Sequence, residues 1–300
     1  YKRQLCIFYA WMSILCYGQT GRLFTADQEL SSSMINSIYQ DHNGIIWIAT
    51  EDGLNKYDGA KFSIYKSDKN DEHSLANNYV RCVFESSKKE CFVGTLSGLQ
   101  HYSADADRFT DIPLILQDGI IVEPNVAAIE ELSNGDLLVG TAGQGLFKIT
   151  NTHKGLVGIS MEKRIPIPIV NALHEDRNGN LWISAGENGI FRIDRNQQLH
   201  CYQKGANESE YTISSICETP DKQIYIGSLG KGLLKYNPTL DLFEPIIYAN
   251  HPELPVKSLL LATPDEIYIG TDGYGLKVYN IQSLSLIHIS EPTRPEPISY

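Results

Sequence analysis

Short apolar runs separated by polar turns recur along most of the chain. In the first clear instance, the runs at 35–40, 45–50, 54–57 and 62–65 are rich in β-branched and aromatic residues, and Asp, Asn and Gly separate them. Runs of this kind bounded by turn residues predict short strands joined by hairpins. Helical periodicity is absent from the sequence, so each repeat of the pattern predicts four antiparallel strands and no helix.

The pattern returns five more times with a period in the low forties. The second run of each repeat ends in a threonine, a serine or an alanine, at Thr50, Thr95, Thr141, Ala185, Ser228 and Thr271. Successive members of this set are 45, 46, 44, 43 and 43 residues apart. This period is typical of four-stranded propeller blades, which bury their faces against neighbouring blades. We therefore predict an all-β β-propeller, with about six blades present of a seven-bladed ring.

The first residues of the chain have the pattern of an export signal. Residues 1–19 combine a basic start at Lys2 and Arg3 with an apolar core at 5–17, which predicts a secretory signal peptide. The apolar core is too short to span a bilayer. An alternative is a lipoprotein in which Cys16 carries the lipid, but the residue before it is a bulky leucine.

The propeller is predicted to occupy residues 20–284. Residues 285–300 fit no strand of the repeat, and they resemble the translated adapter or vector sequence found at the ends of incomplete assemblies. We therefore predict that they form a non-native read-through tail.

The net charge and the cysteines indicate which partners and which kinds of site to expect. The net charge of −11 provides no basic field for a polyanion, so we expect no nucleic acid to bind this chain. Cys82 and Cys91 flank one predicted hairpin, where they are either a disulfide or, as we favour, two small buried thiols. No cysteine spacing matches a zinc site, and we predict no metal site and no cofactor.

One turn motif occurs twice, as Asp-x-Asn-Gly-x-x-Trp. It could form part of a calcium loop, but further oxygen ligands at alternate positions are missing. The motif is better explained by hairpin chemistry, in which Asp caps turn amides, Gly accepts a positive φ and Trp packs between blades. The predicted turn and packing residues are Asp41, Gly44, Trp47, Asp176, Gly179 and Trp182.

The sequence contains no recognisable catalytic motif. Its eight histidines are scattered, and none belongs to a nucleophile elbow or to a His-Glu-x-x-His motif. We therefore predict no catalytic residue. A propeller enzyme would need a histidine and an acid that converge near the ring axis, for which His73, His153 and His251 are the residues to inspect.

Loops on one face of the ring are the predicted recognition surface. In a four-stranded blade the loops between strands two and three emerge on the same face as the connections between blades. The longer connections between blades, 67–78 and 110–124, are expected to lie on this same face. Loop residues vary between the repeats while the framework recurs, as expected for recognition on a rigid scaffold, although ordinary solvated loops would look the same. The candidate ligand-binding residues are Glu51, Asp52, Gln144, Glu187, Asn188, Lys231, Asp272 and Tyr274.

The repeat itself resembles a known family. Residues 35–58 follow the pattern I-x-x-I-x-x-D-x-x-G-x-I-W-I-A-T-x-x-G-L-x-x-Y-D, and residues 74–84 read SLANNYVRCVF. Both resemble the two-component-regulator propeller repeat and its lead-in between blades. The resemblance extends over nearly all of 30–280, in six copies.

This resemblance implies an extracytoplasmic sensor. Such repeats are found in the periplasmic half of hybrid two-component histidine kinases that sense glycans, where propellers and a β-sandwich precede a membrane helix and kinase domains. The implied partners are an oligosaccharide ligand and the rest of a sensor ectodomain, in a homodimeric parent anchored in the inner membrane. No kinase or receiver motif lies in this chain. The alternatives are a free-standing periplasmic propeller enzyme of the lyase type and a structural interaction module.

Overall fold

The computed structural model describes residues 24–25, 29–202, 212–246 and 254–288. Within these ranges the regular structure is β-strand, apart from one short 3-10 helix, η1 (Gly186–Asn188). The described residues contain no helix with the length and apolar character needed to cross a membrane. The predicted signal peptide (1–19) and residues 289–300 of the predicted tail lie outside the described residues.

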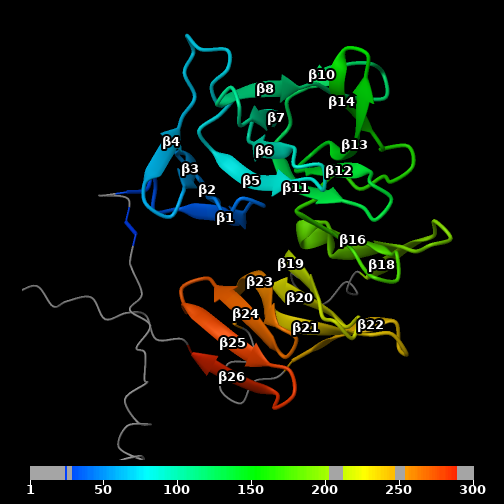
Figure 1. Cartoon of the computed structure of the whole chain (residues 1–300). Helices are drawn as coiled ribbons and strands as arrows, with labels where there is room; N and C mark the ends of the chain where they lie inside the picture. Colours follow the sequence, from blue (N-terminus) through cyan, green and yellow to red (C-terminus); the bar gives the residue numbers. More distant parts are fainter. Residues whose placement is uncertain (1–23, 26–28, 203–211, 247–253, 289–300) are drawn as a thin grey trace, which may run out of the picture.

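The strands form six sheets that follow one another around a ring in chain order (Figure 1). Blades 1 and 2 contain β1 (Ile35–Gln40), β2 (Ile46–Thr50), β3 (Gly53–Tyr57) and β4 (Phe62–Tyr65), and β5 (Val80–Glu85), β6 (Cys91–Thr95), β7 (Gly98–Ser103) and β8 (Arg108–Ile112). Blades 3 and 4 contain β11 (Val126–Glu131), β12 (Leu137–Thr141), β13 (Gly145–Thr152) and β14 (Gly155–Ser160), and β15 (Ala172–Glu175), β16 (Leu181–Ser184), β17 (Ile190–Ile193) and β18 (Leu199–Tyr202). Blades 5 and 6 contain β19 (Ile213–Glu218), β20 (Ile224–Ser228), β21 (Gly232–Asn237) and β22 (Leu242–Pro245), and β23 (Val256–Thr263), β24 (Glu266–Thr271), β25 (Leu276–Asn280) and β26 (Ser285–His288). The predicted all-β propeller with six blades is therefore confirmed.

Successive blades stack through an apolar residue at, or two positions before, the start of the inner strand. A Cβ added to Gly94 would lie 2.6 Å from Val126 Cγ1, and one added to Gly140 would lie 2.4 Å from Val170 Cγ1. Glycine in the second strand thus lets the inner strand of the next blade approach closely. The stacking residues of blades 2 to 6 are at most 1% exposed, and they are Val80, Val126, Val170, Ile213 and Val256.

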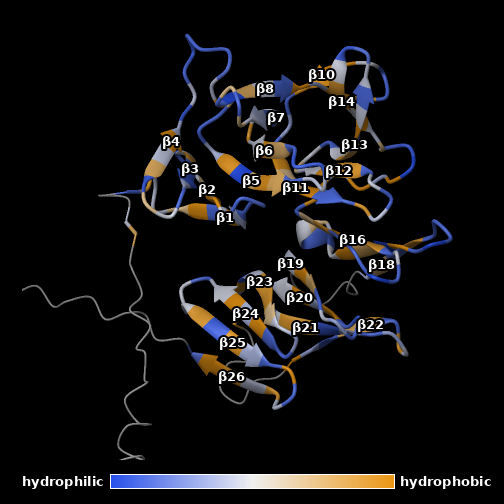
Figure 2. Cartoon of the chain, in the orientation of Figure 1, coloured by the Kyte–Doolittle hydropathy of each residue, from blue (hydrophilic) through white to orange (hydrophobic). Residues whose placement is uncertain are grey.

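The two ends of the ring lack this stacking. Ile35 of blade 1 occupies the position of the buried valines but is 45% exposed. In blade 6, Leu276 is 38% exposed, whereas its equivalents Leu54 and Leu233 are fully buried. Figure 2 shows apolar residues on β1 and β26 at these ends of the ring. One face of blade 1 and one face of blade 6 therefore have no adjoining sheet within the described ranges, and a seventh blade is not among the described residues.

Two segments differ from the expected loop and tail. Within 110–124, β9 (Leu114–Ile115) and β10 (Ile121–Val122) form a hairpin, and β9 pairs in parallel with β14, so blade 3 has six strands. The expectation of a simple connecting loop is wrong here, because Leu114 packs against Gly158, where any Cβ would clash with it. The first four residues of the predicted tail pair with β25 as β26, where we expected no strand.

The cysteine pair of blade 2 is not bridged. Cys82 and Cys91 are both free thiols, as we favoured over a disulfide. Burial raises the pKa of each thiol to about 12, so both remain protonated and unreactive at neutral pH.

Candidate functional site

The first Asp-x-Asn-Gly-x-x-Trp turn is held together by its aspartate. Asp41 Oδ1 accepts hydrogen bonds from the amides of Asn43 (2.9 Å) and Ile45 (3.0 Å). Its Oδ2 accepts one from Trp47 Nε1 (3.1 Å), which fixes the indole ring between blades. Gly44 has φ +82°, a conformation that side-chain-bearing residues rarely adopt.

Asp176 repeats this arrangement in blade 4 with one more hydrogen bond. Its Oδ1 accepts from the amides of Asn178 (2.9 Å) and Asn180 (2.8 Å). Its Oδ2 accepts from Asn180 Nδ2 and from Trp182 Nε1, both at 2.8 Å. The carboxylate is thus fully occupied by its own turn, which is the role expected of a structural residue.

Six side chains recur as a cluster at two blade interfaces. The blade 1–2 cluster consists of Trp47, Lys56, Tyr65, Tyr102, Asp107 and Phe109, and the blade 4–5 cluster consists of Trp182, Arg192, Tyr202, Tyr236, Asp241 and Phe243. In each, the tryptophan packs edge-on against the tyrosine of the next blade, with ring centroids 5.0 and 4.9 Å apart. The cation lies over the tryptophan ring, at 5.3 Å for the lysine and 5.4 Å for the arginine.

An aspartate joins the two tyrosines of each cluster. Asp107 Oδ1 accepts hydrogen bonds of 2.6 Å from both Tyr65 and Tyr102. Asp241 Oδ1 accepts bonds of 2.7 Å from Tyr202 and 2.5 Å from Tyr236. Because the two tyrosines come from adjacent blades, each aspartate fastens one blade to the next.

The protonation states of these groups suit this fastening role. The hydrogen bonds from Tyr102 and Tyr65 hold the pKa of Asp107 below its ordinary value of 3.8. Burial, together with the bond to Asp107, raises the pKa of Tyr65 to about 12. The carboxylate is therefore ionised and the phenol neutral at neutral pH, so donor and acceptor are fixed. We assign the clusters to stability and not to chemistry.

A second set of contacts links blades near the tight turns. A glutamate near the end of an inner strand accepts a hydrogen bond from a turn amide of the preceding blade. Glu85 accepts one from His42 N (2.9 Å), and Glu218 accepts one from Arg177 N (3.0 Å). The same contact joins Ser87 to Glu131 and Ser133 to Glu175. At the next turn Pro220 has no amide hydrogen, and Leu261 stands where the glutamate would be, so donor and acceptor are lost together.

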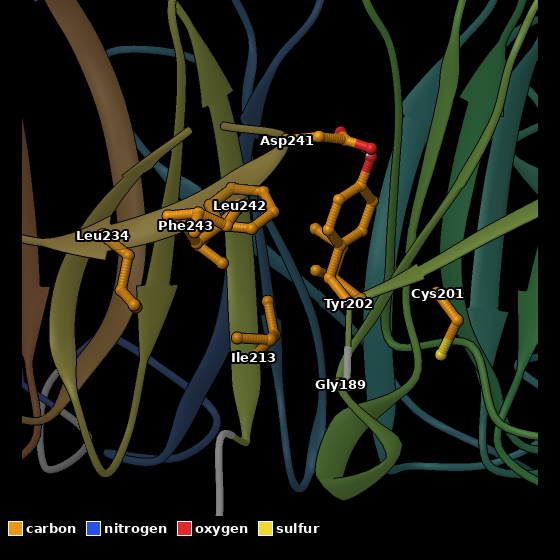
Figure 3. A pocket seen from close by; sticks show the side chains of 10 residues that line it. Gly189, Cys201, Tyr202, Ile213, Leu234, Asp241, Leu242 and Phe243 are labelled. Carbon is orange, nitrogen blue, oxygen red and sulfur yellow. Dashed lines mark hydrogen bonds between the residues drawn. The ribbon is translucent and has the colours of Figure 1, made fainter. Parts of the chain in front are cut away.

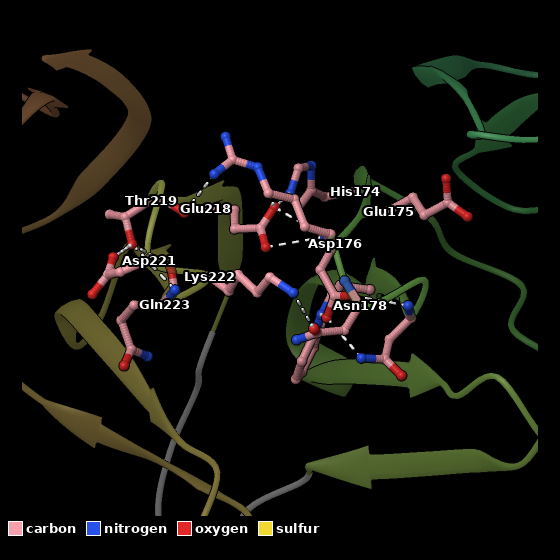
Figure 4. Close-up of polar contacts among 12 residues, drawn as sticks. His174, Glu175, Asp176, Asn178, Glu218, Thr219, Asp221, Lys222 and Gln223 are labelled. Carbon is pink, nitrogen blue, oxygen red and sulfur yellow. Dashed lines mark hydrogen bonds and ion pairs between the residues drawn. The ribbon is translucent and has the colours of Figure 1, made fainter. Parts of the chain in front are cut away.

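His174 lies between carboxylates from two neighbouring blades, one of which, that of Glu218, is labelled in Figure 4. Its Nδ1 is 3.7 Å from Glu130 Oε1 of blade 3, and its Nε2 is 3.6 Å from Glu218 Oε2 of blade 5. Burial lowers the pKa of His174, but the two carboxylates outweigh it and leave the pKa raised above 6.5. This is a histidine–acid arrangement on inner strands, and sequence reasoning missed it because it treated the histidines as scattered and singled out only His73, His153 and His251. The available signal was spacing, since each glutamate lies 44 residues from the histidine.

A cavity of about 360 Å³ lies between blades 4 and 5 (Figure 3). Its walls are mainly apolar side chains, including Ile213, Leu234 and Phe243. The polar groups Tyr202 and Asp241 also line it, but they are hydrogen-bonded to each other. The cavity offers apolar contact, and we assign no ligand to it.

The eight predicted ligand-binding residues are spread over the loops of five blades. Asp52 contacts Lys66 Nζ at 2.6 Å and Asn78 Nδ2 at 3.1 Å, and Glu51 accepts a bond of 3.2 Å from the Tyr79 hydroxyl. Gln144 lies beside a cavity of about 360 Å³, and Glu187 and Asn188 form part of η1. Lys231 lies between β20 and β21, and Asp272 and Tyr274 lie between β24 and β25. Asp272 is 3.1 Å from Lys257. The structure brings Glu51 and Asp52 together on one loop, but it does not gather the eight into one pocket.

Of the three histidines singled out for an enzyme, the two with described positions do not converge. His73 lies 3.8 Å from Glu72, whose side chain is largely exposed, on the connection between blades 1 and 2. His153 is exposed in the turn between β13 and β14, and His251 lies outside the described residues. Among the residues whose positions are described, no three His, Cys, Asp or Glu side chains gather closely enough to hold a metal ion.

These features define a propeller assembled from one repeated blade. The model of the two component regulator propeller family matches residues 29–52 and 165–187. Histidine kinase P4 of Formosa agariphila is 43% identical over 53 residues, which are 18% of this chain and 4% of that protein. The chain therefore contains two-component-regulator propeller repeats.

Solved structures with the same fold include a sensor ectodomain and a lyase. The extracellular domain of a hybrid two-component system from B. thetaiotaomicron superposes with a TM-score of 0.76 at 21% identity, over 91% of this chain and 37% of that one. Virginiamycin B lyase from Staphylococcus aureus superposes with a TM-score of 0.65 at 13% identity, over 91% of this chain and 88% of that one. The chain thus spans well under half the length of the sensor domain it matches, and it shares its fold with sensor ectodomains and with lyases.

Proposed function

We propose that the chain is the ligand-recognition or scaffold propeller of an extracytoplasmic sensor that belongs to a hybrid two-component histidine kinase. In this proposal the parent protein is anchored in the inner membrane, the propeller lies in the periplasm, and the sensor responds to oligosaccharides as a homodimer. The observation that carries the proposal is the ring of six repeats, which matches both the repeat family and the fold of a hybrid-system ectodomain. Residues 1–19 would act as the signal peptide and the residues from 20 onward as the propeller, whose last strand, β26, takes up the first four residues of the appended tail predicted at 285–300.

The contacts between blades suit a part that transmits a rigid-body change. A signal requires that the ligand bind one arrangement of the ectodomain more tightly than another. The aspartate-bridged clusters and the glutamate–amide contacts fasten adjacent blades, so the propeller would move as one unit. Catalysis of phosphoryl transfer would belong to other domains of the parent.

Calorimetry on the complete ectodomain tests this proposal. The protein would be titrated with defined neutral and acidic oligosaccharides, and with amino acids and nucleotides as other ligand classes. We expect saturable binding of at least one oligosaccharide. Tight binding of another class, with no heat from any sugar, would overturn the oligosaccharide assignment.

A lyase is the second candidate, and one observation favours it. His174 and Glu130 form a histidine–acid pair on inner strands, and a lyase shares the fold over most of its length. Incubation of the chain with virginiamycin B, followed by mass spectrometry, tests this candidate. Ring opening that is lost in a His174→Gln variant would support it, and intact antibiotic after prolonged incubation would exclude that substrate.

A further inference from the structure

A polar groove of about 480 Å³ opens beside the tight turns between blades 4 and 5. Asp176, Asn178 and Asn180 line it from blade 4, and Lys222 and Gln223 line it from blade 5. Lys222 reaches across to Asn178, with Nζ 3.1 Å from Oδ1 (Figure 4). The volume lies within the range of sites for small organic ligands, about 300–1,000 Å³.

The back of the groove is the blade 4–5 cluster. Trp182, Tyr236 and Arg192 line it, and the two rings are almost fully buried, so they offer edges and not an exposed stacking surface. Arg192 hydrogen-bonds the Tyr236 hydroxyl and lies 3.4 Å from Asp241. Its Nε, however, is buried and has no hydrogen-bond partner among the described residues. A buried donor without an acceptor is unfavourable, and because this atom has almost no exposed surface, an oxygen in the groove reaches it only when the guanidinium shifts toward the groove.

The remaining groups offer both donors and acceptors. The carboxylate of Asp176 is used up by its own turn, as described above. Asn180 Oδ1 and Gln223 Oε1 accept no hydrogen bond within the described part of the chain, whereas Lys222 has ammonium hydrogens to spare. The two carboxylates and two cations lining the groove cancel in formal charge. A neutral ligand rich in hydroxyls, each of which donates and accepts, fits this set.

The equivalent interface between blades 1 and 2 supplies an internal comparison. The framework is the same there, with Asp, Trp, Tyr and Asp at matching positions. Lys222 is also kept, as Lys89, whereas Ile45, Lys56 and Glu90 replace Asn180, Arg192 and Gln223. Lys56 donates to the Tyr102 hydroxyl at 2.9 Å and has no counterpart of the unpaired Nε. The two copies thus share most of the groove lining and differ at the three positions that correspond to Asn180, Arg192 and Gln223.

We propose that the groove between blades 4 and 5 binds one or two sugar rings of a neutral oligosaccharide. Lys222 Nζ donates to ring hydroxyls, the Arg192 guanidinium donates to them once it shifts toward the groove, and Asn180 Oδ1 and Gln223 Oε1 accept from them. This site rests on the proposed sensor function and locates it beside the tight turns, away from the loop residues singled out in the sequence. The interface between blades 1 and 2 keeps the lysine, as Lys89, but lacks the other three groups and does not bind.

The test replaces the groove residues with those of the other copy. The triple variant Asn180→Ile, Arg192→Lys, Gln223→Glu uses side chains that the same framework already accepts in blades 1 and 2. The reciprocal variant Ile45→Asn, Lys56→Arg, Glu90→Gln is the matched control. Thermal unfolding of both variants, compared with the native chain, establishes that they are folded.

Saturation-transfer NMR and calorimetry would use xylotetraose, mannotetraose, cellotetraose and galactotetraose as probes on the full chain. We expect binding of at least one probe, weakened at least tenfold in the triple variant and not weakened in the reciprocal one. Equal binding by the native chain and a folded triple variant overturns the groove and leaves the sensor function standing. No binding of any probe to the chain, with binding of the same probes to the complete ectodomain, also overturns the groove. No binding to either protein counts against the sensor function as well.

Discussion

Removing the Asp176 carboxylate tests whether the turn motif is a structural device. In an Asp176→Ala variant, four hydrogen bonds are lost. Water can replace the carboxylate at the turn amides and at the Asn180 side chain. It cannot easily reach Trp182 Nε1, because that side chain is only 1% exposed. The main cost should therefore come from one buried donor left without an acceptor.

The magnitude follows from the nature of that bond. A hydrogen bond to a charged group contributes about 1.5–3 kcal/mol, and an unsatisfied buried donor costs about 1–3 kcal/mol. We expect the variant to lose about 3 kcal/mol of the free energy of unfolding. A Trp182→Phe variant removes the donor together with some buried surface, and we expect it to lose about 2 kcal/mol.

A double-mutant cycle isolates the contact between Asp176 and Trp182. The full chain, the two single variants and the double variant would be unfolded in urea and followed by far-UV circular dichroism, with unchanged m-values as the check on cooperativity. We expect a coupling of about 1–2 kcal/mol, because the double variant leaves no orphaned indole N–H. The cycle at Asp41 and Trp47 is the matched control, and its longer bond of 3.1 Å should give a smaller coupling.

Additive effects, within about 0.5 kcal/mol, would refute this reasoning. They would mean that water satisfies the indole when the carboxylate is gone, so that burial of Trp182 does not exclude solvent from Nε1. If either single variant fails to fold, the Asp176→Asn variant provides the measurement instead, because its side chain keeps one acceptor oxygen.

Three further predictions concern single residues. Because the pKa of His174 is raised above 6.5, its stabilising effect is present below that value and is lost as the pH rises through the raised pKa. The melting temperature of the native chain should therefore fall from pH 6 to pH 8 by more than that of a His174→Gln variant, and parallel pH profiles would contradict this. The pKa of Asp107 is lowered below 3.8, so its contribution is present above that value and is lost as the pH falls through the lowered pKa. An Asp107→Asn variant should be less stable than the native chain at pH 7. Its free energy of unfolding, measured in urea, should also decrease less as the pH is lowered. An equally steep decrease in both proteins would count against the hydrogen bonds from the two tyrosines to Asp107. A Cβ at Gly140 would lie 2.4 Å from Val170 Cγ1, so Gly140→Ala should destabilise the chain by about 1–3 kcal/mol, and Val170→Ala in the same chain should recover part of that loss. Simple addition of the two losses would mean that the contact between blades is not the cause.

The blades could be predicted from the sequence because each strand is specified by its own residues. In blade 1, the apolar run, the turn at Asp41 and Gly44, and the next apolar run lie within about 20 residues of one another. The same local signal returns in each repeat, so errors in one copy are corrected by the others. The ring then follows from the need to cover both faces of every sheet.

Contacts between distant residues could not be predicted in this way. β9 is a strand of only two residues, and it exists because Leu114 packs against a glycine more than 40 positions later. The histidine–acid arrangement joins three blades, and the groove between blades 4 and 5 depends on which side chains have spare hydrogen-bonding groups. The loop candidates were chosen by position alone, and their side-chain partners, such as Lys66 for Asp52, became apparent only in three dimensions.

The surfaces at the two ends of the ring, which no sheet among the described residues covers, have a consequence for self-association. The surface with Ile35 on blade 1 and the surface with Leu276 on blade 6 are opposite sides of the same repeated interface, so they are complementary to each other and not to themselves. Two molecules can therefore join head to tail, and each dimer formed in this way still exposes one surface of each kind. Such heterologous association propagates into filaments unless something caps it. A single additional sheet inserted between the two surfaces would act as that cap and end polymerisation within one molecule.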